Sequence, residues 1–249
     1  MTQTFVRLPF LMSLLIAGNL LAEDMSAVEI LIMADSVANA PQDQYMESTM
    51  VLIDKDGDEK ERKMVMHQKG ADMRLVRFLS PADQKGISFL SLPDDVMYLY
   101  LPAFRKIRMI ASHVKNQNFA GTDFSYDDMS SFKFAEEYDP VLTEPSNEHY
   151  QLELTPKASV DKDYSKLIMT ITKDSYVSIR VEYYDKGGNL WKVMTKDEIS
   201  RIGGYWVAKV MQMQDLKKNH STKMIINEIE YDMGQSDDIY TKRNLKRTR

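Results

Sequence analysis

Residues 77–132 read RFLSPADQKGISFLSLPDDVMYLYLPAFRKIRMIASHVKNQNFAGTDFSYDDMSSF, and their first half alternates side chains with the two-residue period of β-strands. The clearest run is Val96–Leu101, where even and odd positions fall on opposite faces. Pro93-Asp94-Asp95 precedes that run and Pro102 follows it, and such residues favour turns. The stretch therefore predicts short antiparallel strands joined by tight turns.

The same period continues on both sides of this stretch, from Tyr45 to Tyr231, and predicts about twelve strands, one of them over Lys133–Tyr138. Residues 54–58 read DKDGD, which we interpret as a hairpin turn and not a calcium loop, since no Glu follows at the twelfth position. Ser26 and Glu29 form a capping box that predicts a helix over Ser26–Ala38. The fold class is mainly β (α+β), with one large curved antiparallel sheet.

The two ends of the chain differ in character from the strands. Residues 1–22 carry a basic Arg7, an apolar run and a small residue at Ala22, which predicts a cleaved secretory signal peptide. Residues 23–249 then form a single domain, and residues 235–249 read as a polar, basic tail. Such a tail is most simply a solvated end; the alternative is contact with an anionic membrane or an acidic partner.

The composition excludes several classes of function. The chain has no cysteine, so disulfides and thiolate chemistry are ruled out, and its net charge of −5 gives no electrostatic basis for nucleic-acid binding. Its four histidines have no metal-ligand spacing and no nucleophile motif appears, so we expect no metal, no cofactor and no enzyme. The 18 methionines fit either ordinary core packing or a cavity for flexible apolar ligands.

Two features of residues 77–132 point beyond a plain sheet core. Apolar side chains are concentrated between Phe78 and Phe124, more than one strand face needs, so a part of them could line a ligand pocket. Residues 111–131 interrupt the strands with a long polar loop that carries its own aromatic residues, and such loops are often functional.

The stretch resembles the LolA-like superfamily of periplasmic outer-membrane lipoprotein-sorting proteins, and more closely the branch found beside RND-type (MMPL) exporters. The matching pieces are Arg77-Phe78 with Ser80-Pro81, Lys85-Gly86, the strand end Tyr98–Pro102, Arg105–Arg108 and the block Phe119–Met129. The resemblance implies an unclosed antiparallel β-barrel, with an N-terminal helix and short helices covering its concave face. It also implies a hydrophobic cavity for acyl chains and a periplasmic location.

From this resemblance and the strand pattern we assign candidate site residues in three groups. The expected cavity wall comprises Phe78, Phe89, Leu92, Met97, Leu99, Leu101, Phe104, Ile107 and Met109. A mobile lid over residues 111–131 would carry Phe119, Gly121, Phe124, Tyr126 and Met129. Arg105, Lys106 and Arg108 would contact a lipid headgroup or a partner protein, or else only protect a sheet edge.

The expected function is a monomeric, non-enzymatic carrier that binds the acyl chains of lipoproteins or lipids for transfer towards the outer membrane. Its expected partners are that cargo, an inner-membrane RND/MMPL exporter and, transiently, a membrane. Two alternatives stay open: an exporter scaffold that carries nothing, and an enzyme acting on lipid or cell-wall substrates. The absence of a catalytic motif argues against the enzyme.

Overall fold

The computed structural model describes residues 25–130, 133–144 and 146–247. Its helices are α1 (Ala27–Ala38), α2 (Phe134–Glu137) and α3 (Lys242–Leu245), and its 3₁₀ turns are η1 (Pro102–Phe104), η2 (Ser112–Val114), η3 (Phe119–Gly121) and η4 (Asp237–Ile239). The strands are β1 (Asp43–Ile53), β2 (Glu59–Lys69), β3 (Met73–Ser80), β4 (Ser88–Leu92), β5 (Val96–Leu101), β6 (Lys106–Ile110), β7 (Tyr138–Leu142), β8 (His149–Pro156), β9 (Tyr164–Thr172), β10 (Ser178–Asp185), β11 (Leu190–Ile202), β12 (Tyr205–Asp215) and β13 (His220–Tyr231). The predicted signal peptide, residues 1–22, lies outside the described residues.

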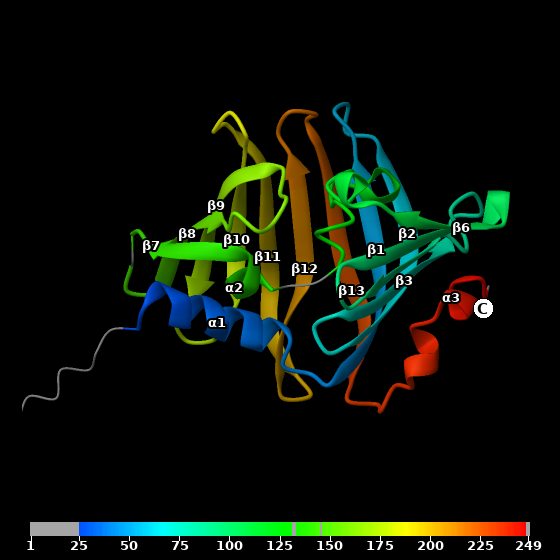
Figure 1. Ribbon diagram of the computed structural model, residues 1–249, viewed down its shortest axis with the longest axis horizontal. Coiled ribbons are helices and arrows are strands. Elements are labelled where there is room, and N and C mark those ends of the chain that lie inside the picture. The colour runs from blue at the N-terminus through cyan, green and yellow to red at the C-terminus, as the bar shows by residue number, and fades with distance from the viewer. Residues whose placement is uncertain (1–24, 131–132, 145, 248–249) are drawn as a thin grey trace, which may run out of the picture.

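All strands belong to one 13-stranded sheet in the order β6-β5-β4-β3-β2-β1-β13-β12-β11-β10-β9-β8-β7. Every pairing is antiparallel. All of them join strands that are neighbours in sequence, apart from the pairing of β1 with β13. The sheet curls into an open half-barrel, and its two edges, β6 and β7, do not pair (Figure 1). The predicted class, a mainly β protein with a curved and unclosed antiparallel sheet, is confirmed.

Local sequence determines the ends of these elements. Ser26 caps α1, and its capping box with Glu29 forms as the sequence predicts. The DKDGD segment is the β1–β2 hairpin turn, in which the Asp54 carboxylate accepts hydrogen bonds from the N–H groups of Asp56 and Asp58 at 3.0 Å each. The calcium alternative is therefore not needed to explain this motif.

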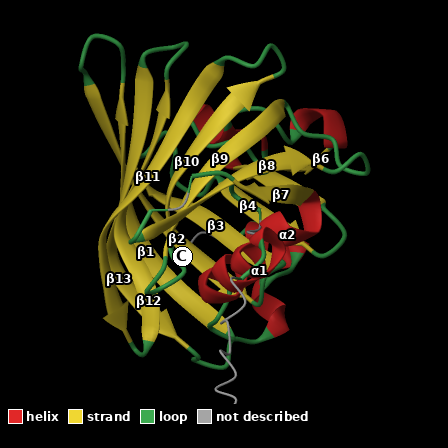
Figure 2. Cartoon of the chain, turned by 90° about the vertical axis from the view of Figure 1, so that its left-hand side faces the viewer, coloured by secondary structure: helices red, strands yellow, loops and turns green. Residues whose placement is uncertain are grey.

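Helices α1 and α2 cover the concave face of the sheet, where the main core lies (Figure 2). α1 contacts β7 and α2, while residues 111–130 pass from the β6 edge toward the β7 edge across the concavity. On the opposite, convex face, residues 236–247 pack over β3, β4 and β5. Among the described residues, no helix has the length and hydropathy that crossing a bilayer demands.

Two local expectations are wrong. Residues 134–137 form α2 and the strand starts only at Tyr138, because a helical turn places Phe134 beside Tyr138, with ring centroids 5.9 Å apart. The C-terminal segment is not a solvated end up to residue 247, because Tyr240 and Leu245 are buried against Leu75 and Leu90.

Candidate functional site

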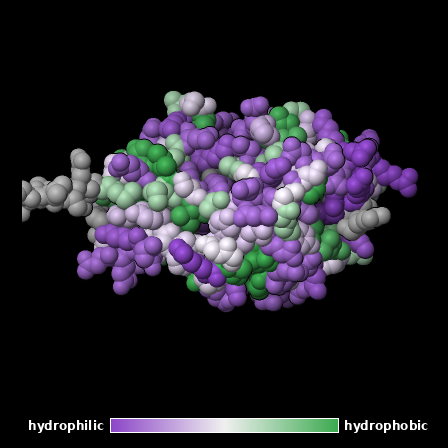
Figure 3. Space-filling view, turned by 90° about the horizontal axis from the view of Figure 1, so that it is seen from below, coloured by the Kyte–Doolittle hydropathy of each residue, from purple (hydrophilic) through white to green (hydrophobic). Residues whose placement is uncertain are grey.

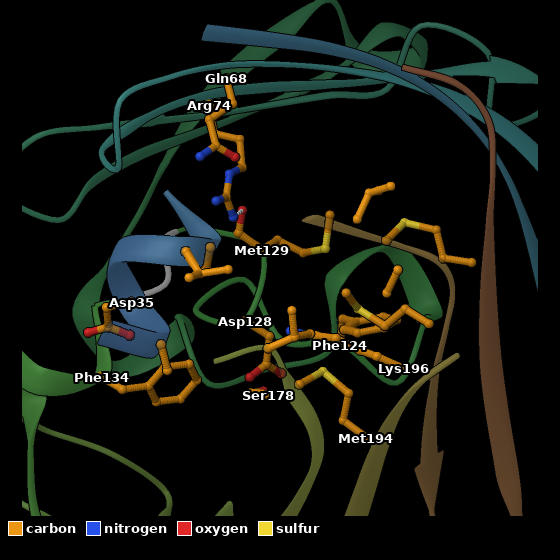
Figure 4. A pocket seen from close by; sticks show the side chains of 18 of the residues that line it. Asp35, Gln68, Arg74, Phe124, Asp128, Met129, Phe134, Ser178, Met194 and Lys196 are labelled. Atoms are coloured by element: carbon orange, nitrogen blue, oxygen red, sulfur yellow. Dashed lines mark hydrogen bonds between the residues drawn. The ribbon is translucent and has the colours of Figure 1, made fainter. Parts of the chain in front are cut away.

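A cavity lies inside the half-barrel, between the concave face and α1, α2 and residues 124–129 (Figure 4). Its volume is about 190 Å³. For comparison, an apolar cavity of roughly 150 Å³ can hold benzene. Strands from both halves of the sheet contribute to the wall, from β1 to β3 on one side and from β9 to β13 on the other.

Methionine is the most frequent residue in the wall of this cavity. The eight lining methionines are Met46, Met64, Met66, Met129, Met169, Met194, Met211 and Met224. The antiparallel register gathers them, since Met46 lies opposite Met66 and Met211 lies opposite Met224 on neighbouring strands. Side chains opposite each other share one face of a sheet, so strands far apart in sequence form one continuous apolar surface.

One side of the cavity opens to solvent. The lining residues Trp206, Ala208, Ile229 and Tyr231 are only partly buried, and they come from the ends of β12 and β13. The C-terminal half of α1, with the partly buried Val37, lines the cavity too. This combination defines a mouth between α1 and the β12–β13 end of the sheet.

Several charged side chains of the wall have shifted pKa values, and in Lys196, Arg74 and Asp128 burial is the main cause and sets the direction. Burial lowers the pKa of Lys196, on β11, to about 8 and that of Arg74, on β3, to about 10. Arg74 donates a hydrogen bond to the carbonyl oxygen of Met129 at 3.3 Å. Burial also raises the pKa of Asp128, against the opposing effects of Lys192 and of hydrogen bonds from Ser125. An apolar environment explains all three directions, because it disfavours the charged form.

A buried ion-pair cluster closes the cavity beside α2. Lys162 bridges Asp127 and Glu137 with N–O distances of 2.6 and 2.7 Å. Burial lowers the pKa of Lys162, but the two carboxylates outweigh burial and the net shift is upward. The bridge joins residues 111–130 to the end of α2, so it stabilises the cover of the cavity and offers no free nucleophile.

Four of the five predicted lid residues, Phe119, Phe124, Tyr126 and Met129, are buried, whereas Gly121 is exposed. Phe124 and Met129 line the cavity, whereas Phe119 and Tyr126 pack against Phe89 with centroids 5.6 and 5.9 Å away. Gly121 has a φ of +78°, which favours glycine. The segment fills one end of the half-barrel as a plug, and its mobility stays a prediction.

Polar contacts anchor this plug to the sheet through Asp123. Its carboxylate accepts a hydrogen bond from the Thr222 hydroxyl at 2.6 Å and lies 2.7 Å from Nδ1 of His220. Its N–H donates to the Thr222 hydroxyl at 3.0 Å, and its carbonyl accepts from Lys192 Nζ at 2.8 Å. We call Asp123, Lys192, His220 and Thr222 the clasp.

None of the nine residues expected on the cavity wall lines the cavity described above. Phe78, Phe89, Met97 and Leu99 are buried in the core at the β3–β5 end, where the plug covers them, and Leu101 packs against the same core. Leu92 and Ile107 belong to the convex-face cluster, and Phe104 and Met109 are exposed. The many apolar side chains between Phe78 and Phe124 thus serve both faces of the sheet. Alternate side chains along each strand contact the plug on one face and the C-terminal segment on the other.

Arg105, Lys106 and Arg108 are exposed at the β5–β6 hairpin and at the free edge of the sheet, away from the cavity wall. Sequence reasoning missed Trp206 and seven of the eight lining methionines, which lie on β1, β2, β9 and β11–β13. The high methionine count was the available signal. In the described part of the chain, no cluster of three or more His, Cys, Asp or Glu residues could hold a metal ion.

An open antiparallel half-barrel with helices across its concave face and an apolar cavity beneath them defines a LolA-like fold. A family model described as "uncharacterized protein" matches residues 70–247, and the chain belongs to that family.

Three solved structures resemble the chain closely. A DUF1329 family protein from Desulfovibrio piger has a TM-score of 0.83 at 28% identity, covering 88% of this chain and 97% of its own. An outer membrane lipoprotein-sorting protein domain, as its description names it, from Vibrio parahaemolyticus has a TM-score of 0.78 at 27% identity, covering 87% and 98%. A LolA superfamily protein from Nitrosomonas europaea has a TM-score of 0.74 at 20% identity, covering 88% and 99%. No curated protein matches the chain.

Proposed function

We propose that this protein is a non-enzymatic periplasmic carrier that holds acyl chains of a lipid or lipoprotein in the methionine-lined cavity and delivers them towards the outer membrane. The observation that carries the proposal is the apolar wall of eight methionines beneath α1 and the plug. The likeness of the chain to a LolA superfamily protein and to a lipoprotein-sorting domain supports a carrier of this kind.

The chemistry of the wall suits a flexible apolar ligand. Methionine side chains are unbranched and polarizable, so they adapt to chains of different shape. Each buried methylene contributes about 0.8 kcal/mol, so ten methylenes would contribute about 8 kcal/mol before ordering costs. A volume of about 190 Å³ accommodates a short segment of such a chain, and a longer one requires α1 or the plug to move.

The first experiment asks whether the purified protein carries lipid. We expect lipid extraction followed by mass spectrometry to recover acyl-containing molecules from protein made in a membrane-containing host. A consistently lipid-free protein would contradict the carrier. If that lipid-free protein bound a neighbouring RND-type exporter, the exporter-scaffold function would replace the carrier proposal.

A matched pair of substitutions locates the cargo. Met211→Glu places a charge on the cavity wall, whereas Met233→Glu makes the same change at a position that is 44% exposed and does not line the cavity. We expect Met211→Glu to reduce bound lipid at least tenfold, because burying a carboxylate beside an acyl chain is costly. Equal lipid content in both folded variants would exclude this cavity as the site.

A further inference from the structure

The β6 edge of the molecule combines exposed cations with exposed apolar side chains. Phe104 and Met109, which the sequence suggested for the cavity, are each 63% exposed. We define the basic edge as these two residues together with the exposed cations of the β5–β6 hairpin and of the C-terminal segment, namely Arg105, Lys106, Arg108, Lys242, Arg243, Lys246 and Arg247.

Cross-strand contacts join the two parts of this surface although about 130 residues separate them in sequence. Met109 lies opposite Tyr98 in the β5–β6 register, and Nζ of Lys242 lies 4.0 Å from the centre of the Tyr98 ring. Ile107 packs in the same convex-face cluster as Leu245 of α3. The hairpin and α3 therefore lie side by side at one end of the molecule (Figure 1), where Ile107 and Met109 are on the convex face of β6 and Lys106 and Arg108 are on its concave face.

The charge of this surface is opposite to that of the whole chain. Residues 102–110 and 240–247 contain no Asp or Glu, while the chain as a whole has a net charge of −5. Within the described residues, none of the seven cations of the basic edge makes an ion pair with a carboxylate. Viewed from below, the right-hand end of the molecule is strongly hydrophilic (Figure 3).

The apolar part of the surface projects from it. Phe104 ends η1, the turn at the tip of the β5–β6 hairpin, which extends from the right-hand end in Figure 1. A projecting aromatic residue surrounded by Lys and Arg is suited to the boundary between lipid headgroups and acyl chains, where apolar side chains enter and cations meet phosphates. A protein interface instead centres on a buried apolar patch with a polar rim.

We propose that the basic edge docks the protein on the surface of a bilayer that contains anionic lipids, with Phe104 and Met109 entering the headgroup region. This inference goes beyond the carrier function, because it does not depend on what the cavity holds. It places the docking surface at the β6 edge, separate from the cavity mouth between α1 and the β12–β13 end.

Vesicle co-sedimentation of the purified protein tests the proposal. We expect binding to phosphatidylcholine vesicles that contain 30% phosphatidylglycerol, weaker binding in high salt, and no binding to phosphatidylcholine alone. Each basic residue near an anionic surface contributes roughly a fivefold change in partitioning. Lys106→Glu/Lys242→Glu should therefore weaken binding at least tenfold.

The controls match charge and hydropathy. Lys55→Glu/Lys186→Glu makes the same change in net charge at exposed positions in the β1–β2 and β10–β11 turns, and should bind like the wild type. Phe104→Ser/Met109→Ser should weaken binding, whereas Val141→Ser, at a residue 61% exposed on β7, should not. Folding of each variant is checked by its melting temperature.

Three results would overturn the proposal: no binding to anionic vesicles at low salt, equal losses in the two lysine pairs, or unchanged binding of Phe104→Ser/Met109→Ser. Lysine-dependent capture of an acidic protein without vesicle binding would assign the surface to that protein. Met211→Glu changes the cavity and leaves the basic edge intact. Vesicle binding that persists in this variant would show that docking does not depend on cargo, so the docking proposal and the carrier proposal can fail separately.

Discussion

Asp35 joins the two helices that cover the cavity. It lies on α1 and lines the cavity, and its carboxylate accepts a hydrogen bond from the N–H of Ala135 at 2.8 Å. Burial raises the pKa of Asp35 to about 6, although hydrogen bonds from Ala135 and Phe134 oppose the shift. The folded protein therefore favours the protonated, neutral acid more than the unfolded chain does.

The raised pKa of Asp35 leads to a prediction for Asp35→Asn, which keeps an oxygen acceptor for the N–H of Ala135 but has no charge. A raised pKa costs stability when the group is ionised, and the cost disappears as pH falls from about 6 towards the ordinary value of 3.8. We expect the variant to be more stable than the wild type at pH 7, by on the order of 1 kcal/mol given partial exposure. At pH 4 the two should have nearly the same stability.

Denaturant unfolding at the two pH values measures this difference. Asp35→Ala serves as the control, since it removes the acceptor and should destabilise the protein at both values. A variant Asp35→Asn that is less stable than the wild type at pH 7 would contradict the account.

Single residues also show where sequence reasoning succeeds and where it stops. The methionine content fitted either ordinary core packing or an adaptable apolar cavity, and eight methionines line a cavity. The alternation within β5 and β6 divides side chains between two faces but does not say which face is concave. Phe104 and Met109 were consequently expected inside, whereas the structure exposes them at the sheet edge.

Among the elements, the plug depends on the clasp for its position. Thr222 is buried, and its hydroxyl both donates to the Asp123 carboxylate and accepts from the Asp123 N–H. Thr222→Val retains the shape of the side chain but removes its hydroxyl. Both the N–H and the carboxylate of Asp123 then lose a hydrogen bond, and each buried polar group left unsatisfied costs about 1–3 kcal/mol. We expect faster amide hydrogen exchange across residues 115–130 in this variant.

Thr49→Val is the matched control for the clasp. The Thr49 hydroxyl accepts a hydrogen bond from Asn227 at 2.9 Å, but this bond is exposed to water. Its loss should change plug exchange little. Equal exchange rates across residues 115–130 in the two variants would mean that the clasp does not hold the plug.

The C-terminal segment stabilises the opposite, convex face of the sheet. Leu245 is fully buried, and the Arg77 guanidinium donates to the carbonyl of Asn244 at 2.7 Å. We expect Leu245→Ala to lower the free energy of unfolding by about 2–4 kcal/mol, the usual cost of such a cavity. Lys246→Ala, at an exposed neighbour, should change it by less than about 0.5 kcal/mol. A similar small effect for Leu245→Ala would argue against docking of the segment.

The element boundaries that failed share one cause. Residues 134–137 and 236–247 are short and polar, with only a few apolar side chains, so their local pattern carries little information. Their structures depend on long-range contacts: Phe134 and Ala135 pack against the concave-face core, while Tyr240 and Leu245 fill the convex face of β3 and β4. Capping and turn residues, which act locally, were read correctly at α1 and at the β1–β2 hairpin.

At the scale of the whole molecule, the sheet could be predicted but the cavity could not. Period-two strands joined by tight turns imply antiparallel neighbours along the chain, as found. The pairing of β1 with β13 joins strands at opposite ends of the sequence, and it alone brings Met46 and Met66 into one surface with Met211 and Met224. No local pattern encodes that pairing, so the candidate wall was placed on β3–β6.

Photo-crosslinking with a diazirine-bearing fatty acid, followed by peptide mapping, tests the central claim most directly. The account predicts adducts on β11, β12 and β13, at or near Met194, Met211 and Met224, and their loss when unlabelled fatty acid competes. Adducts concentrated on β4–β6 around Leu99, or no competable adduct in a folded protein, would contradict it.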